Sequence, residues 1–295
     1  MAWNDKYWDI IDQLYWWPRY LGLRSINRRH WQTEGDRISI PASLVNKSGP
    51  LYTRRLKVGE LMEDLRGKEE ILNHVFDLTF AIAPDALIQR AFLTPFSFSD
   101  SSTFQSIGRE VQLRYGWGQH DNVTQQDGLF VSDRSIVGVE LKLGSSSWPI
   151  QILKYAALFA WEEMHSGPRE HVGLLYIVPE NALSTHWKSC GLKGPDINAS
   201  FLDSFSGTDL PAYLAKFLAE NRHQLATLLD RLQLAAISWK DFRSSLCTFR
   251  DDQDVRTPGG QTLCRLVNGL VAQIDVHKGV GIESELSTLR SNTFS

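Results

Sequence analysis

"DGLFVSDRSIVGVELKLGSSSWPIQILKYAALFAWEE", residues 127–163, contains the pattern that decides the fold. Its first part predicts two strands, DGLFVSD and SIVGVELKL, with SDRS as the hairpin turn between them. Ser and Pro residues before an amphipathic run then predict a helix that ends at Gly167. The apolar run HVGLLYIVPE at 171–180 follows as a central strand. A strand, a helix and a further strand in this order predict a right-handed crossover in a mixed sheet.

Two opposite charges, Glu140 and Lys142, lie inside the most apolar part of the second strand. Side chains alternate between the two faces of a strand, so Glu140 and Lys142 share one face while Val139 and Leu141 point to the other. A buried carboxylate is costly unless it is paired or binds a metal. The strand is therefore a candidate functional element.

Asp127 supplies a second carboxylate at the start of the preceding strand. Antiparallel pairing brings the start of one strand beside the end of the next, which places Asp127 near Glu140. Two converging carboxylates suit Mg²⁺, which is held by one or two carboxylates and keeps several waters. Lys142 is then expected to hold or polarise an attacking water and to stabilise developing phosphate charge.

The helix that follows adds Gln151 and Tyr155, which share a face because they are four residues apart. Lys154 lies next to them, and Ile152 and Phe159 form the face expected to pack on the sheet. A Gln and Tyr pair at the start of a helix can form hydrogen bonds to phosphate or sugar oxygens.

In this order, Asp127, Glu140-Leu-Lys142 and Gln151-x-x-x-Tyr155 resemble the PD-(D/E)xK nuclease superfamily, and most closely its RecB-like branch with the QxxxY motif. The resemblance covers about residues 66–180 and implies a restriction-endonuclease-like α/β core, with a mixed central sheet flanked by helices and a helical C-terminal region after it. One departure is Gln126, where the family often has proline.

The resemblance also implies roles for individual residues. Asp127, Glu140 and the Leu141 carbonyl would bind Mg²⁺ or Mn²⁺, and Lys142 would be catalytic. Gln151 and Tyr155 would position the substrate. The family often supplies another acid from its first core helix, for which Glu70 is the candidate and Glu69 and Glu110 are the rivals.

The rest of the chain predicts three regions. Residues 1–65 are aromatic and basic in patches, with a short strand expected in GDRISIPASLV; the basic patches suit either a solvated surface or a nucleic-acid contact. Residues 66–180 form the nuclease-like core, with helix over 58–93 interrupted at Pro84, a loop at 97–106 and a strand at 109–117. Residues 181–295 are predicted to be mainly helical, including one long helix over 209–236.

Composition excludes several other classes. The 295 residues carry a net charge of −3, include three widely spaced cysteines and contain no long apolar run, so neither a membrane span nor a disulfide framework is expected. These features favour a cytoplasmic protein. We expect a Mg²⁺-dependent nuclease, acting on DNA rather than RNA, in DNA processing or phage defence. The alternative is a catalytically inactive module that binds nucleic acid or protein on the same fold.

Overall fold

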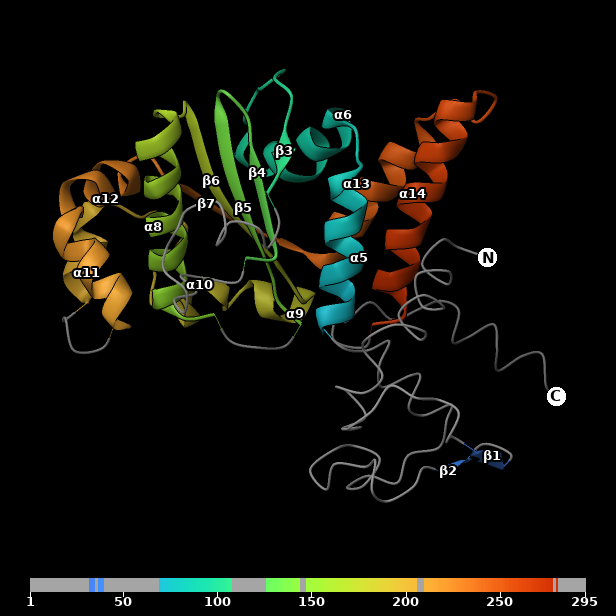
Figure 1. The fold of residues 1–295 in the computed structure, drawn as a ribbon, viewed down its shortest axis with the longest axis horizontal. Helices are drawn as coiled ribbons and strands as arrows, with labels where there is room; N and C mark the ends of the chain where they lie inside the picture. The colour runs from blue at the N-terminus through green and yellow to red at the C-terminus, as the bar shows by residue number, and fades with distance from the viewer. Residues whose placement is uncertain are drawn as a thin grey trace.

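A five-stranded mixed sheet lies at the centre of the structure (Figure 1). The computed structural model describes residues 71–107, 126–143, 147–205, 210–277 and 280, the backbone of 69–70, and two short strands near the N-terminus. The sheet order is β3-β4-β5-β6-β7. The first two pairings are antiparallel, and β5-β6 and β6-β7 are parallel. The strands are β3 Gln105–Ser106, β4 Gly128–Val131, β5 Ser135–Leu141, β6 His171–Val178 and β7 Gln233–Ser238.

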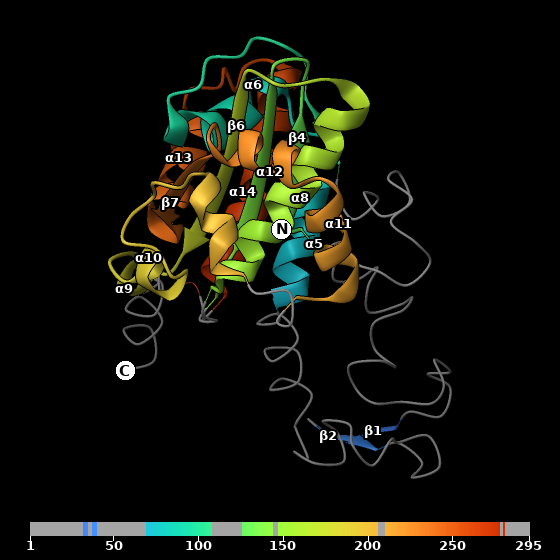
Figure 2. The ribbon, with the colours of Figure 1, turned by 90° about the vertical axis from the view of Figure 1, so that its left-hand side faces the viewer.

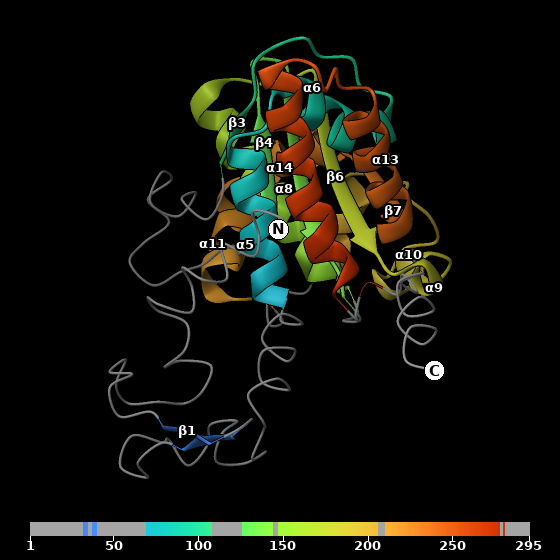
Figure 3. The same ribbon diagram turned by 90° about the vertical axis from the view of Figure 1, so that its right-hand side faces the viewer.

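Helices cover both faces of this sheet. One layer contains α8, α11 and α12, which lie in front of the strands in Figure 2. The other layer contains α5, α13 and α14, which Figure 3 shows from its outer side. The helical elements are α5 Glu69–Ala81, α6 Asp85–Ile88, η3 Gln89–Leu93, η4 Thr94–Phe96, α8 Pro149–Ser166, α9 Glu180–Leu183, α10 His186–Ser189, η5 Ala199–Ser204, α11 Ala212–Glu220, α12 Arg222–Leu229, α13 Trp239–Asp251 and α14 Pro258–Asp275.

Strand β5 has the predicted alternation. Val137, Val139 and Leu141 are fully buried in the apolar cluster beneath α5, α13 and α14. Gly138, Glu140 and Lys142 alternate with them and therefore face the α8 layer. The hairpin from β4 to β5, the helix that ends before Gly167 and the central position of β6 are confirmed. The α/β class with a mixed sheet flanked by helices is confirmed with them.

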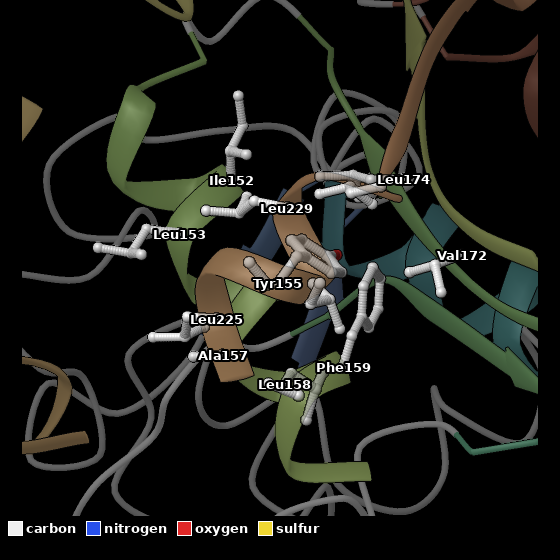
Figure 4. Packing of buried hydrophobic residues seen from close by; sticks show 14 of the residues in the cluster. Ile152, Leu153, Tyr155, Ala157, Leu158, Phe159, Val172, Leu174, Leu225 and Leu229 are labelled. Carbon is white, nitrogen blue, oxygen red and sulfur yellow. The ribbon is translucent and has the colours of Figure 1, made fainter. Parts of the chain in front are cut away.

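Gly138 lets α8 approach β5 closely. A Cβ atom at this position would lie 2.7 Å from the rings of both Tyr155 and Phe159. Glycine therefore leaves the space that these two rings fill. Both rings lie in the apolar cluster between α8 and the sheet, together with Leu174 of β6 and Leu229 of α12 (Figure 4).

The predicted helix over 209–236 is wrong in its last part. The chain forms α11 and α12 and then turns into β7, which pairs with β6 from Gly173↔Gln233 onward. Residues 233–275 thus add an edge strand and two helices to the same body as the predicted core. The change from helix to strand follows from pairing along β6, because strand formation depends strongly on tertiary context.

Smaller differences occur on the N-terminal side. Of the helix predicted from residue 58 to Pro84, α5 confirms the part at Glu69–Ala81, while residues 58–68 lie outside the described residues. Leu78, which fits the helical period of α5, is 41% exposed. The predicted loop at 97–106 ends in the short strand β3. The predicted strand at 109–117 lies outside the described residues. Strands β1 Gln32–Glu34 and β2 Arg37–Ser39 form a separate antiparallel pair, and β2 lies within the predicted strand segment.

None of the described helices, including the long helices α8 and α14, is both long and apolar enough to cross a bilayer.

Candidate metal centre

The β4-β5 hairpin brings Asp127 and Glu140 to the same end of the sheet. Gly128 pairs with Val139, so continuing this antiparallel register by one residue places Asp127 opposite Glu140. Oδ2 of Asp127 accepts a hydrogen bond from the backbone N–H of Leu141 at 2.8 Å. Asp127 is half-buried and Glu140 is 5% exposed. The carboxylates therefore occupy the neighbouring positions that strand pairing predicts.

Three side chains donate hydrogen bonds to Glu140. Its Oε1 atom accepts from Lys142 Nζ at 2.7 Å and from Gln151 Nε2 at 2.6 Å. Its Oε2 atom accepts from the Tyr155 hydroxyl at 2.8 Å. The structure thus brings together the four residues predicted from β5 and α8. It also explains how this side chain remains buried, because a carboxylate with a cation and two further donors is compensated.

Tyr155 is fully buried, with its ring among the apolar side chains of α8 and the sheet (Figure 4). Burial, followed by the negative charges of Glu140 and Asp127, raises the pKa of its hydroxyl well above its ordinary value. The hydroxyl therefore stays protonated, and it reaches both Glu140 and the Val139 carbonyl, the latter at 2.9 Å. This geometry makes Tyr155 a residue that orients Glu140, whereas the family resemblance implied a contact with substrate.

Two residues that sequence reasoning missed support the same site. Asn73 of α5 donates from Nδ2 to Oδ1 of Asp127 at 2.7 Å. Trp239, which is fully buried at the start of α13, donates from its indole Nε1 to the Lys142 carbonyl at 2.8 Å. Neither residue belongs to a local motif that points to β5. A long-range contact of this kind leaves no spacing signal in a single sequence.

The oxygen atoms near Asp127 suit a hard cation such as Mg²⁺. The N–H and C=O groups of one strand residue point to the same neighbouring strand, so the Leu141 carbonyl faces the side where its N–H meets Asp127. The Asn73 Oδ1 atom is buried and accepts no hydrogen bond within the described part of the chain. Carboxylate, backbone carbonyl and amide oxygens are all ligands that such a cation accepts.

The predicted additional acid lies outside the described side chains. Glu69 and Glu70 occupy the first turn of α5, four and three residues before Asn73 respectively, so both helix positions lie one turn from the Asp127 contact. Glu110 falls in the segment 108–125, which is not described. Over the residues whose side chains are described, no group of three or more His, Cys, Asp or Glu side chains could hold a metal ion.

A second polar cluster lies on the α8 side of the sheet, next to Lys142. His186 of α10 is 4% exposed, and burial, together with the positive charge of Lys142, lowers the pKa of its imidazole to about 4. Its Nε2 atom lies 3.7 Å from the Cys190 Sγ atom, and its ring lies 4.5 Å from the Tyr176 ring. His186 is therefore neutral at physiological pH.

Comparisons with protein-family models, with curated proteins and with solved structures found no match for this chain.

Proposed function

We propose that this protein is a Mg²⁺-dependent nuclease that hydrolyses phosphodiester bonds of DNA. The observation that carries the proposal is that the β4-β5 register, continued by one residue, places Asp127 opposite Glu140, with Lys142 bonded to Glu140. Two adjacent carboxylates next to an ammonium group form a site that can hold a divalent cation and stabilise an anionic phosphate. The resemblance to the PD-(D/E)xK superfamily supports the same assignment, and with it a role in DNA processing or phage defence.

Each residue of the site has a defined task in this proposal. Asp127, Glu140 and the Leu141 carbonyl would hold Mg²⁺ or Mn²⁺, which when bound lowers the pKa of water and polarises the phosphoryl group. Lys142 orients the attacking water and stabilises the charge that develops on the phosphate oxygens. Gln151 and Tyr155 fix the carboxylate of Glu140, while Asn73 fixes that of Asp127.

A second candidate function is binding without catalysis. The observation that favours it is that both carboxylate oxygens of Glu140 already accept hydrogen bonds, from Lys142, Gln151 and Tyr155. In this reading the buried ion pair only maintains the fold of a module that binds nucleic acid or protein. Calorimetric titration with Mn²⁺ separates the two functions, since a structural ion pair gives no metal-binding heat.

The nuclease proposal is tested by cleavage of linear, circular and single-stranded DNA in the presence of Mg²⁺ or Mn²⁺. Glu140→Gln should lower the rate on the order of 10³-fold, because it removes a charged metal ligand while keeping the side-chain shape. The matched control is Glu170→Gln, which changes an exposed glutamate paired with Arg134 at 2.6 Å near the other end of β5. Equal activity of Glu140→Gln and the wild type would overturn the assignment.

A further inference from the structure

The residue immediately before α8 is an exposed tryptophan. Trp148 is 64% exposed and immediately precedes Pro149 in the first turn of the helix. It belongs to neither of the apolar clusters of the fold. An indole is large, flat and apolar, so one left open to solvent is well suited to binding a flat partner.

Trp148 is linked to the candidate metal centre through Gln151. The backbone N–H of Gln151 donates to the Trp148 carbonyl at 2.9 Å, and the Trp148 N–H donates to the Gln151 Oε1 atom at 3.4 Å. The same Gln151 side chain donates to Glu140 from its Nε2 atom. One residue therefore joins the backbone of the exposed tryptophan to a carboxylate of the site. The main chain of Trp148 is thereby held beside the site where the phosphate would be cleaved.

Positive charge lies close to Trp148 as well. The segment after α10 runs against Pro149, because a Cβ atom at Gly191 would lie 3.0 Å from the Pro149 Cγ atom. Lys188 in α10 and Lys193 in the segment after it are both exposed. Lys154 follows Gln151 by three residues and so lies on the same side of α8. Exposed aromatic rings among basic side chains are the features with which proteins hold single-stranded nucleic acid.

We propose that Trp148 stacks on an unpaired base next to the phosphodiester bond that is cleaved, so that the substrate is single-stranded DNA or a frayed DNA end. The inference rests on the proposed nuclease function and specifies its substrate. A base inside a duplex already stacks on both neighbours, whereas an unpaired base offers a free face to the indole. Lys188 and Lys193 neutralise the backbone phosphates of the same strand.

Equilibrium binding tests the stacking separately from cleavage. We would measure the fluorescence anisotropy of a labelled single-stranded oligonucleotide of about 12 nucleotides, which lies within the usual site sizes. Ca²⁺ replaces Mg²⁺ so that binding is followed without turnover. The same measurements use an oligonucleotide of equal length that is abasic throughout, and a blunt duplex. The proteins are the full chains of the wild type, Trp148→Ala, Trp148→Phe and the double variant Lys188→Gln/Lys193→Gln.

The expected results differ among these probes. Trp148→Ala should weaken binding to the single strand by about 5- to 100-fold, whereas Trp148→Phe should stay within about 3-fold of the wild type. Neither substitution should change binding to the abasic strand or to the duplex. The double lysine variant should weaken binding to the normal and abasic strands equally and reduce the salt dependence of both.

Three results would overturn the stacking proposal: unchanged binding of Trp148→Ala to the single strand, an equal loss on the abasic strand, or no binding of the wild type to the single strand. Circular dichroism and thermal unfolding check that Trp148→Ala is folded. If the wild type shows the base-dependent binding but cleaves no DNA in Mg²⁺ or Mn²⁺, the stacking site stands and the nuclease function fails.

Discussion

Two buried carboxylates lie at opposite ends of the β4-β5 hairpin, and both are 5% exposed. Asp100 lies at the turn, where its Oδ2 atom accepts from the hydroxyls of Ser132 and Ser135, each at 2.5 Å. Its Oδ1 atom accepts from the Ser102 N–H at 2.8 Å. Glu140 lies at the other end, where it is held by an ammonium, an amide and a phenol.

The two carboxylates are equally buried and differ in the groups that surround them. The three serine groups that donate to Asp100 are neutral. They belong to a tight turn and a nearby loop, so these hydrogen bonds fix the local backbone. Glu140 instead has a second carboxylate opposite it in the register, and one of its donors is the ammonium group of Lys142. A divalent cation could therefore replace Lys142 at Glu140. Asp100, in contrast, is a single carboxylate whose oxygens accept hydrogen bonds from three serine groups.

The largest effect should come from breaking the ion pair at Glu140. Lys142→Met leaves a buried carboxylate without its cation, which costs about 3–5 kcal/mol in the free energy of unfolding when no metal is present. The double variant Lys142→Met/Glu140→Gln should recover most of this loss, because neither charge remains. Urea unfolding measures both proteins. A loss below about 1 kcal/mol in the single variant would show that the pair is effectively solvated.

A smaller effect is expected at the turn. Asp100→Asn should lower the free energy of unfolding by about 1–3 kcal/mol at about pH 7, because it weakens the bonds from Ser132 and Ser135. DNA cleavage at 25 °C should stay close to the wild-type rate, since Asp100 is at the end of the hairpin away from Glu140. A large loss of activity in a folded protein would contradict the structural role of Asp100.

The same carboxylate should make stability depend on pH. Burial raises the pKa of Asp100, but the hydrogen bonds from Ser132, Ser135 and Ser102 outweigh burial and lower it from 3.8 to about 2. Because the pKa is lower in the folded protein, the unfolded chain takes up the Asp100 proton first as the pH falls. The stability that Asp100 contributes is therefore complete above about pH 4 and is lost as the pH falls towards 2. The difference in stability between the wild type and Asp100→Asn should shrink over this interval in urea titrations.

The smallest effect on stability should come from Tyr155→Phe. This substitution removes one hydrogen bond to Glu140 and leaves the ring in its apolar site, so it should cost about 1 kcal/mol of unfolding free energy. Mn²⁺ affinity should fall more clearly, by about 10- to 100-fold, because the hydroxyl orients the carboxylate that we propose as a metal ligand. Calorimetry with Mn²⁺ measures this affinity. Equal Mn²⁺ affinity in the wild type and the variant would show that the Tyr155 hydroxyl has no role in metal binding.

The sequence pattern was sufficient to predict the part of the site that local periodicity controls. Alternation along β5 separated Glu140 and Lys142 from Val139 and Leu141, and hairpin pairing placed Asp127 opposite Glu140. The spacing of Gln151 and Tyr155 placed both on one side of α8. These contacts depend on strand period, helix period and a short turn, all of which a single sequence contains.

What the sequence did not predict depends on long-range packing. Residues 233–238 follow two helices and contain leucine and alanines. They form a strand because they pair with the edge of β6. Trp239 reaches Lys142 across 97 positions in the chain, and Asn73 reaches Asp127 across 54. Leu78 fits the helical period of α5, yet it is 41% exposed.

The most direct test of a metal centre between Asp127 and Glu140 is a crystal structure of the wild type soaked in Mn²⁺, with data collected at the manganese absorption edge. We predict an anomalous peak within coordination distance of both carboxylates, with the Lys142 Nζ atom displaced from Glu140 Oε1. Absence of the peak, with Lys142 still bonded to Glu140 at high Mn²⁺ concentration, would contradict the account and favour a structural ion pair.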